Sequence, residues 1–314
     1  MDRIVLVARS LKKAEKAKLA VDSVLSARHD KKPAKIETFE CDQSSLGSVR
    51  CFAEALREAM GRWDANSVDG GPSGLDVVCL NAAVLTSKGS NAQYTEDDME
   101  LTFQTNHLAS FLLMNLIHDL VNPGGRIILT TSGLHEGPSF GGFQGIVDAT
   151  SGEITSEFDM VDGSVFDYKE AYSLSKLCVT TFCVALNQRL KRLGKDVVAN
   201  CFSPGLITST GLFRHQSFAS RVLYAAMMNN FAGMGSTIQW GGGALAWMVT
   251  ADEAKGSGGN FWKTPPGSTH LEPLYGETFC TGPTPSEAAD QANQEILWRV
   301  SAELTGISVD HMAA

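Results

Sequence analysis

Three short, largely apolar segments constrain the fold of this chain more than any other feature. They are Leu75–Leu80, residues 126–131 and Val197–Phe202, and each is bordered by stretches with helical periodicity. A strand that is apolar along most of its length is buried on both faces. Such strands, alternating with helices, are typical of a parallel sheet covered by helices on both sides. The sequence therefore predicts an α/β fold.

The rest of the chain continues this alternation and shows no internal repeat or low-complexity tract. We interpret residues 1–314 as one domain with an insertion at 133–168 and a C-terminal region at 218–285. The insertion is too long for an ordinary loop, so we expect a lid rather than a surface loop without a task. The other expected elements are strands at 4–8 and 35–39, helices at 11–27, 46–61, 96–121 (one long or two abutting) and 167–193, and a turn at 122–125.

Composition and charge argue against several classes of protein. The net charge of −9 and the pI near 5.3 argue against nucleic-acid binding and against electrostatic attachment to anionic membranes. No apolar span is long enough for a transmembrane segment, and no signal or transit peptide is visible. The seven cysteines lack a C-x-x-C pair, which favours reduced thiols over disulfides or a metal site. We expect a soluble protein, and the sequence leaves open a cytoplasmic or plastid location and a homo-oligomeric state.

Polar residues at the ends of the expected strands mark a candidate site. Ser132 follows one strand, and Asn81 and Ala82 follow another. The carboxyl ends of strands are where open α/β sheets place their sites. Tyr172 and Lys176 are four residues apart in an expected helix and share one face of it. An ammonium group beside a phenol favours the phenolate, which makes the tyrosine a usable acid or base; the alternative is an exposed helix face.

Asn106 lies inside the expected helix at 96–121, where asparagine is a poor helix former. Its alternative role is an exposed mid-helix residue. We interpret the neighbouring His107 as a core or interface histidine without a chemical role.

Together these residues resemble the short-chain dehydrogenase/reductase family over nearly the whole chain. The resemblance implies a Rossmann-like doubly wound parallel sheet, NADPH as cofactor and oxidoreductase activity. Within the family, the chain is most similar to the light-dependent protochlorophyllide reductases, in segments 8–15, 105–108, 210–215, 258–262 and 298–304. The residues that carry the family resemblance are Asn81-Ala82-Ala83, Asn106-His107, Ser132, Tyr172 with Lys176, and Ser203-Pro204-Gly205.

The resemblance also implies a role for each site residue. Tyr172 donates a proton as hydride arrives, Lys176 lowers the pKa of the tyrosine and holds the nicotinamide ribose, and Ser132 orients the substrate. Asn106 bends its helix and anchors a water relayed to Lys176. The expected catalytic residues are thus Tyr172, Lys176, Ser132 and Asn106. The expected cofactor-binding residues are Arg9, Lys12, Asp42, Asn81, Ala82, Tyr172, Lys176, Pro204, Gly205 and Thr208.

Two of these cofactor contacts have plain structural alternatives. Arg9, assisted by Lys12 or Lys13, would hold the 2′-phosphate of NADP, because a cation at a helix N-terminus is otherwise poorly placed. The alternative is a solvated charge. Asp42 would contact the adenine amino group, or instead cap the helix that follows it.

The expected fold lacks its first strand and first helix, together with the glycine-rich turn between them. That turn lets the backbone approach the cofactor pyrophosphate, and Met1 directly precedes what resembles the second strand. In the strand order 3-2-1-4-5-6, a missing first strand leaves unpaired backbone groups in the middle of the sheet. We therefore expect the natural chain to begin further upstream. The alternative is a protein that closes the gap by pairing other strands.

Leu206 departs from the protochlorophyllide reductases, which usually have a cysteine at this position in the substrate site. Leucine supplies neither a proton nor a thiol contact. The segment at 218–240 is rich in methionine and aromatic residues and is either helix core or, within the substrate-covering region at 218–285, one wall of a hydrophobic pocket. Three functions remain open: a photoreductase of a tetrapyrrole, a light-independent carbonyl or retinol-type reductase of a hydrophobic substrate, and a non-catalytic pigment- or cofactor-binding protein.

Overall fold

The computed structural model describes residues 3–26, 34–65, 74–87, 91–137, 166–207, 212, 236–264 and 279–312. The chain divides into two compact units, Met1–Ser73 and Gly74–Ala314, and each has a sheet of its own. Thr208, most of the segment at 133–168 and nearly half of the segment at 218–285 lie outside the described residues. The interpretation of the chain as one domain therefore stays a prediction.

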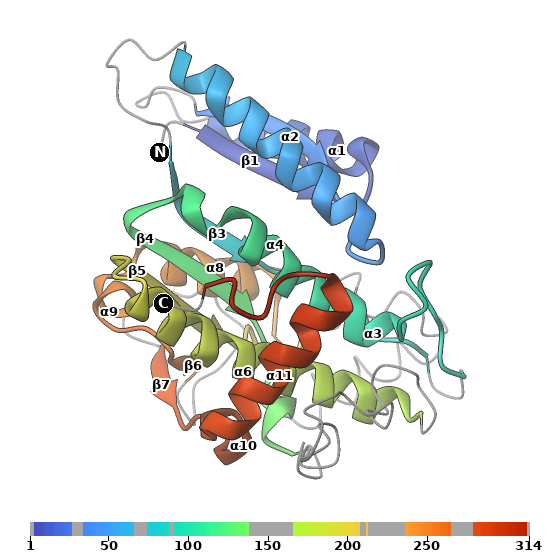
Figure 1. Ribbon diagram of the computed structural model, residues 1–314. Helices are drawn as coiled ribbons and strands as arrows, with labels where there is room; N and C mark the ends of the chain where they lie inside the picture. Colours follow the sequence, from blue (N-terminus) through green and yellow to red (C-terminus); the bar gives the residue numbers. More distant parts are fainter. Residues whose placement is uncertain are drawn as a thin grey trace. The chain divides into compact units, whose positions relative to one another are not determined.

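The first unit is a two-stranded parallel sheet with two helices. Its strands pair in register from Arg3 opposite Lys35 to Ala8 opposite Glu40. Phe39 packs edge-on against Phe52, with 5.8 Å between the ring centroids. The elements of this unit are β1 (Arg3–Ala8), α1 (Leu11–Ser26), β2 (Lys35–Glu40) and α2 (Leu46–Ala65) (Figure 1).

The second unit contains a five-stranded sheet in the order β3-β4-β5-β6-β7. The first four strands are parallel, and β7 is antiparallel to β6. Among the described strands, β1 pairs only with β2, and β3 pairs only with β4. The strands are β3 (Leu75–Leu80), β4 (Val121–Thr130), β5 (Val197–Phe202), β6 (Phe261–Lys263) and β7 (Cys280–Gly282).

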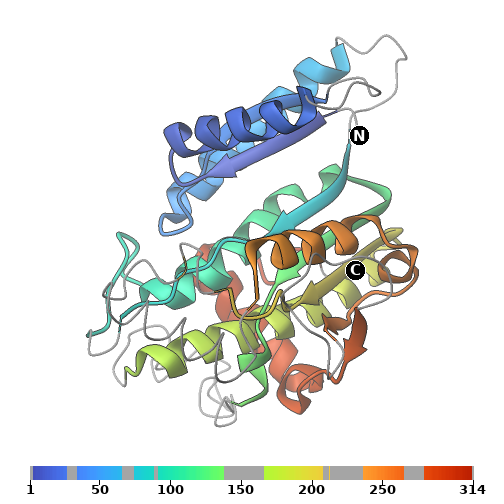
Figure 2. The same ribbon diagram turned by 180° about the vertical axis from the view of Figure 1, so that it is seen from behind.

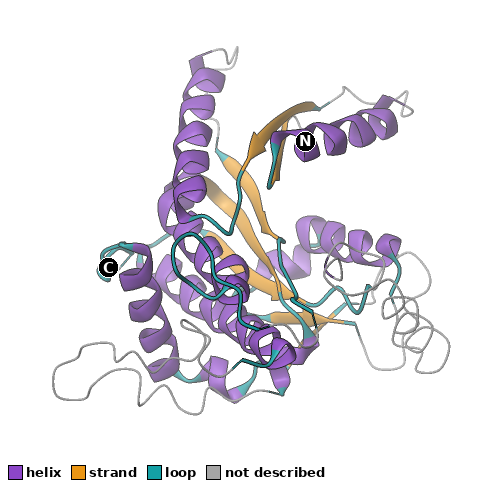
Figure 3. Cartoon of the chain, turned by 90° about the vertical axis from the view of Figure 1, so that its right-hand side faces the viewer, coloured by secondary structure: helices purple, strands orange, loops and turns teal. Residues whose placement is uncertain are grey.

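Helices cover both faces of this second sheet, as the sequence predicts. Helices α4, α6 and α11 lie on one face, and α8 lies on the other, as opposite views of the molecule show (Figures 1 and 2). A side view places the strands between the two helical layers (Figure 3). The helices are α3 (Leu101–Phe103), η1 (Gln104–Leu108), α4 (Ala109–Ile117), η2 (His118–Leu120), η3 (Gly133–Glu136), α6 (Tyr168–Arg192), α8 (Ile238–Thr250), α9 (Asp252–Gly256), α10 (Ser286–Ala289) and α11 (Gln291–Thr305).

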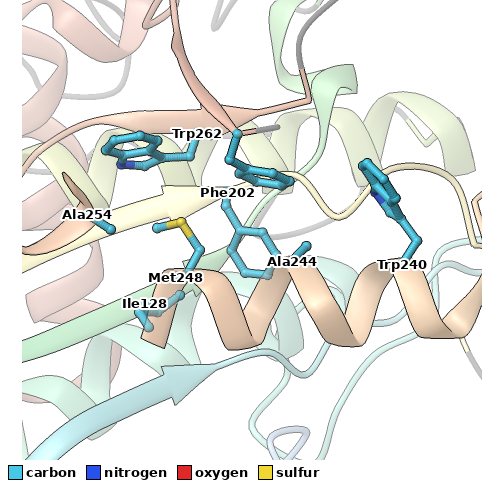
Figure 4. Packing of buried hydrophobic residues seen from close by; sticks show 8 residues of the cluster. Ile128, Phe202, Trp240, Ala244, Met248, Ala254 and Trp262 are labelled. Carbon is cyan, nitrogen blue, oxygen red and sulfur yellow. The ribbon is translucent and has the colours of Figure 1, made fainter. Parts of the chain in front are cut away.

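Apolar side chains fill the space between α8 and the sheet. Met248 on α8 lies near Ile128 of β4 and Phe202 of β5, and Trp240 and Trp262 extend the cluster along the helix (Figure 4). These side chains are almost fully buried. Burying a side chain of this size stabilises the folded state by about 1.5–3 kcal/mol, so the cluster holds α8 against the sheet.

The opposite face has an aromatic core. The rings of Phe111, Phe182 and Trp298 meet at centroid distances of 4.9 to 5.9 Å and come from α4, α6 and α11. The guanidinium of Arg189 on α6 lies 4.0 Å from the centre of the Trp298 ring. The last helix is therefore an integral part of the second unit.

Most of the predicted strands and helices are confirmed, and three boundaries were wrong. The helix expected from residue 96 begins at Leu101, because Glu100 caps it by accepting hydrogen bonds from Thr102 and Phe103. The turn expected at 122–125 is part of β4, where a register shift accommodates it and Gly124 has a positive φ of 74°. Helix α2 runs to Ala65 rather than ending near residue 61.

Within the part of the chain that the structure describes, no helix combines the length and the apolar character needed to span a membrane.

Candidate functional site

Tyr172 and Lys176 lie on one face of α6, close to its beginning. Asp167 starts this helix by accepting hydrogen bonds from the backbone N–H groups of Lys169 and Glu170, at 2.8 and 3.0 Å. Both side chains of the pair are buried, with 7% and 2% of their surfaces exposed. The Nζ atom of Lys176 lies 5.6 Å from the centre of the Tyr172 ring. The expected pair is therefore formed, and it is not an exposed helix face.

Lys176 is held against the end of β4. Its Nζ donates a hydrogen bond to the backbone oxygen of Thr130 at 2.9 Å, which is the only acceptor it meets among the described residues. Burial lowers the pKa of Lys176 from 10.5 to about 8, because the charged form loses hydration. The ammonium group is therefore cationic at neutral pH but close to the range in which it loses its proton.

Ser132 lies two residues beyond the last residue of β4 and near Tyr172. Its Oγ begins the short helix η3 by accepting a hydrogen bond from the backbone N–H of Leu134 at 3.3 Å. The Ser132 side chain also acts to lower the pKa of Tyr172, but burial has the larger effect and raises that pKa from 10.0 to about 12. Desolvation of the phenolate therefore dominates the pKa of Tyr172, and the lowering expected from Lys176 stays a prediction. At neutral pH, Tyr172 is a phenol that can donate a proton.

Asn106 lies in η1, which is a single turn of π-helix between α3 and α4. Its Oδ1 accepts the backbone N–H of Val84 at 2.8 Å, and its Nδ2 donates to the Val84 oxygen and to Ser175 Oγ at 3.1 and 2.9 Å. Single π-turns inside α-helices are frequent at functional sites. The helix is irregular at Asn106, whose side chain is buried rather than exposed, and the water-anchoring role expected for it stays a prediction. Its three bonds tie the segment after β3 to the helix that carries Tyr172.

The ends of β3 and β5 supply the remaining expected residues of the second unit. Asn81 follows β3, and its Oδ1 accepts a hydrogen bond from Thr130 Oγ1 at 2.9 Å; Ala82 is exposed beside it. Pro204 and Gly205 follow β5, where Gly205 has a φ of +81° that a residue with a side chain rarely adopts. A side-chain hydrogen bond thus joins the end of β3 to the end of β4.

Arg9, Lys12 and Asp42 lie in the first unit. Arg9 follows β1, and both basic side chains are exposed. Asp42 follows β2, and its Oδ1 accepts hydrogen bonds from the backbone N–H and the hydroxyl of Ser44 at 3.0 and 2.7 Å. Ser45, rather than Asp42, caps α2 by accepting the N–H of Ser48 at 3.1 Å. The capping role that was the alternative for Asp42 therefore belongs to Ser45, and the adenine contact of Asp42 stays a prediction.

Several polar residues around the site were missed by the sequence reasoning. Thr131 and Thr180 both donate to the backbone oxygen of Lys176 at 3.0 Å, and His135 bonds Thr180 at 2.8 Å. Ser175 donates to the backbone oxygen of Tyr172 at 2.7 Å. The only available signal was spacing, since Thr180 follows Lys176 by four residues on the same helix face.

The donor set of the second unit fits the nicotinamide half of NADPH. A phenol, an ammonium group and the Asn81 carboxamide gather at the carboxyl ends of β3 and β4, and they suit the hydroxyl groups of a ribose. The exposed guanidinium of Arg9 suits a phosphate. The part of the chain that the structure describes contains no glycine-rich turn between a strand and a helix, so we assign no residues to the pyrophosphate.

A cavity of about 380 Å³ lies near the end of η3. None of the expected site residues lines it, although Glu136, one of its lining residues, follows Ser132 by only four positions. Its lining residues are Glu136, Gly137, Pro283, Thr284, Pro285, Ser286 and Glu287.

Comparison with known proteins finds relatives over most of the chain. The chain is 30% identical to "Short-chain dehydrogenase TIC 32 B, chloroplastic" from Brassica napus, over 86% of its own length and 72% of that protein. It is 28% identical to "WW domain-containing oxidoreductase" from Gallus gallus, over 96% and 61%. It is 27% identical to "Protochlorophyllide reductase, chloroplastic" from Daucus carota, over 85% and 64%. The chain thus spans less than two thirds of the length of the last two relatives.

Solved structures share the fold. A short-chain dehydrogenase from Burkholderia cenocepacia J2315, crystallised in complex with NADP, superposes with a TM-score of 0.54 at 18% identity, over 83% of this chain and 85% of that one. A search against models of protein families finds no match.

Proposed function

The chain belongs to the short-chain dehydrogenase/reductase family, and on that premise we propose that it is an NADPH-dependent oxidoreductase of a hydrophobic small molecule. The observation that carries the proposal is the group formed by buried Tyr172 and Lys176 with partly exposed Ser132 beyond the end of β4. A phenol that lies near a serine hydroxyl and an ammonium group is suited to proton transfer. Bound NADPH would supply the hydride.

The residues of the chain account for the proton side of this chemistry. Tyr172 keeps its proton at neutral pH, because burial holds its pKa near 12, and it is therefore the proton donor. The Ser132 side chain acts to lower this pKa and so favours the phenolate that remains after transfer. The positive charge of Lys176 acts in the same direction, and the Thr130 oxygen fixes where that charge lies. Positioned acids of this kind contribute about 10²–10⁴-fold to a reaction rate.

The finer proposal is that the substrate is a chlorophyll precursor reduced after light absorption. It is supported by the similarity to the Daucus carota protein, whose name is protochlorophyllide reductase. In this proposal Tyr172 delivers the proton to a ring double bond. The Arg9 guanidinium would bind the 2′-phosphate that distinguishes NADPH from NADH. The proposal also includes roles for Thr208, for a lid at 133–168 and for a substrate cover at 218–285.

One observation favours a second candidate, a light-independent reductase of a hydrophobic carbonyl compound. Leu206 follows the Pro204-Gly205 pair, and its backbone oxygen accepts the N–H of Ser236 at 2.7 Å. An aliphatic side chain here offers apolar contact but no thiol to a substrate. Ser132, Tyr172 and Lys176 would then serve ordinary carbonyl reduction.

The test combines the chain with NADPH and protochlorophyllide and records the absorbance spectrum before and after illumination. A light-dependent red shift that requires NADPH supports the photoreductase. Oxidation of NADPH in the dark with hydrophobic aldehydes or ketones supports the second candidate. Tyr172→Phe should slow either reaction by about 10²–10⁴-fold. The matched control is Tyr168→Phe, which changes a tyrosine one turn earlier on α6 and should retain the parent rate.

The same variants test the third alternative, a protein that binds a pigment or cofactor without catalysis. If NADPH fluorescence reports binding but no substrate is turned over, and Tyr172→Phe changes nothing, the chain is a binding protein.

A further inference from the structure

A buried polar cluster beside the candidate site has no role in the proton transfer described above. It consists of the side chains of Thr131 just after β4, His135 in η3 and Thr180 on α6, together with the backbone oxygen of Lys176. All three side chains are almost fully buried. A buried hydrogen-bonded cluster of this kind fixes the relative positions of the elements that it joins.

Ser132 lies between Thr131 and His135, two residues whose side chains belong to this cluster. It connects the last residues of β4 to η3, and its backbone oxygen accepts the N–H of His135 at 3.1 Å. The helix η3 has only four residues, and Leu134 within it is 58% exposed. His135 is the one buried residue of η3. The position of the Ser132 hydroxyl therefore depends on how His135 is held.

His135 is held by the helix that carries the catalytic pair. Its Nδ1 lies 2.8 Å from the Oγ1 of Thr180. Tyr172, Lys176 and Thr180 follow one another at four-residue intervals and share one face of α6. The anchor of His135 is thus a side chain of the same rigid helix that positions the phenol and the ammonium group.

The hydrogen bonds of the two threonines bear on which ring nitrogen of His135 carries the hydrogen. Thr131 and Thr180 each have one hydroxyl proton, and each donates to the backbone oxygen of Lys176 at 3.0 Å. The two hydroxyl oxygens also lie 3.0 Å apart, and either can donate in that contact. With both protons on the Lys176 oxygen, the Oγ1 of Thr180 accepts from His135, and we assign the ring hydrogen to Nδ1 on that basis. Nε2 keeps a lone pair, and the ring packs edge-on against Phe261 with 4.3 Å between centroids. Burial lowers the pKa of His135 to about 4, so the ring stays neutral over the physiological range.

We propose that His135 is a positioning residue: through its Nδ1–H bond to Thr180, it holds Ser132 against Tyr172. The inference rests on the proposed function, because it assigns His135 to the site that carries out the proton transfer. His135 itself does not touch the reacting atoms. Its loss should act through misplacement of the Ser132 hydroxyl, and misplacement by about 1 Å can slow a reaction by about 10²-fold.

The test uses two amide variants that mimic different ring nitrogens. In His135→Asn the amide nitrogen replaces Nδ1, so the bond to Thr180 can form. In His135→Gln the amide reaches the Nε2 position, and the bond is lost. We expect His135→Gln to lower kcat about 10- to 100-fold with the KM for NADPH unchanged, and His135→Asn to stay within about threefold of the parent. Equal rates in the two variants would overturn the proposal.

A spectroscopic readout separates this proposal from the proposed function. In protein labelled with ¹³Cζ-tyrosine, the signal of Tyr172 is identified by its loss in Tyr172→Phe. We expect His135→Gln and Ser132→Ala to shift this signal alike, and His135→Asn to leave it in place. An unshifted signal in His135→Gln refutes the proposal whether or not the chain turns over a substrate. Absence of turnover in the parent, with the shift present, refutes only the proposed function.

Two further measurements cover the case in which the histidine variants do not fold. Thr180→Val removes the acceptor from the other side and should shift the Tyr172 signal as His135→Gln does, because Thr131 still bonds the Lys176 oxygen. In the unmutated chain, ¹⁵N spectra should show His135 with its proton on Nδ1. A proton on Nε2 would contradict the assignment.

Discussion

Lys176 is a charged residue in a nearly fully buried position, and this sets the pH range of the proposed reaction. Burial lowers its pKa to about 8, so its charge is present below that pH and is lost as the pH rises through it. We expect kcat/KM for reduction to fall above about pH 8, in a profile that reports the free protein. Lys176→Arg keeps the charge at higher pH and should remove this fall, at a lower plateau because a guanidinium does not fit the site of an ammonium. Lys191→Arg, an exposed change near the end of the same helix, should leave the profile as it is. If kcat/KM still falls near pH 8 in Lys176→Arg, a group other than Lys176 causes the fall.

At the scale of single elements, the π-turn η1 depends on one side chain. Asn106 satisfies both backbone groups of Val84, and in its absence these buried groups lose their partners. We expect Asn106→Ala to lower the free energy of unfolding by about 2–3 kcal/mol, measured by denaturant titration. Asn115→Ala is the matched control, because the Asn115 side chain is equally buried but, among the described residues, bonds only a carbonyl of its own helix, that of Phe111. It should cost clearly less. If both variants lose the same free energy of unfolding, the volume of the buried side chain matters more than the hydrogen bonds to Val84.

At the scale of the whole molecule, His107 joins residues almost two hundred positions apart. Its Nε2 lies 2.7 Å from Ser301 Oγ on α11, among the rings of Phe103 and Phe182. Burial lowers its pKa to about 3, so the unfolded chain binds this proton more readily than the folded one. Stability contributed by the neutral ring is complete above about pH 6.5 and is lost as the pH falls toward 3. We therefore expect the free energy of unfolding to decrease from pH 7 to pH 5, and His107→Gln to reduce that slope. If the free energy of unfolding of His107→Gln depends on pH as steeply as that of the parent, other groups cause the loss of stability in acid.

The sequence pattern was most reliable where neighbouring residues decide the structure. The strands β3 and β5 begin and end where their apolar runs do, and α6 begins at the Asp167 cap. The early start expected for the helix near residue 96 failed because Glu100 caps from within the segment, and Asp98 there adopts a positive φ of 58°. Capping by a residue inside a helical pattern is not visible as a change of periodicity.

For the candidate site, the sequence determined which chemical groups share a helix face or end a strand. The four-residue spacing of Tyr172 and Lys176, and the place of Ser132 after β4, follow from helix and strand geometry alone. Only the tertiary structure decided that the pair is buried, that desolvation raises the pKa of the phenol, and that His135 and Thr180 meet behind it. The reason is physical: periodicity is a property of neighbouring residues, whereas burial and hydrogen bonding between distant segments depend on how the helices pack against the sheet.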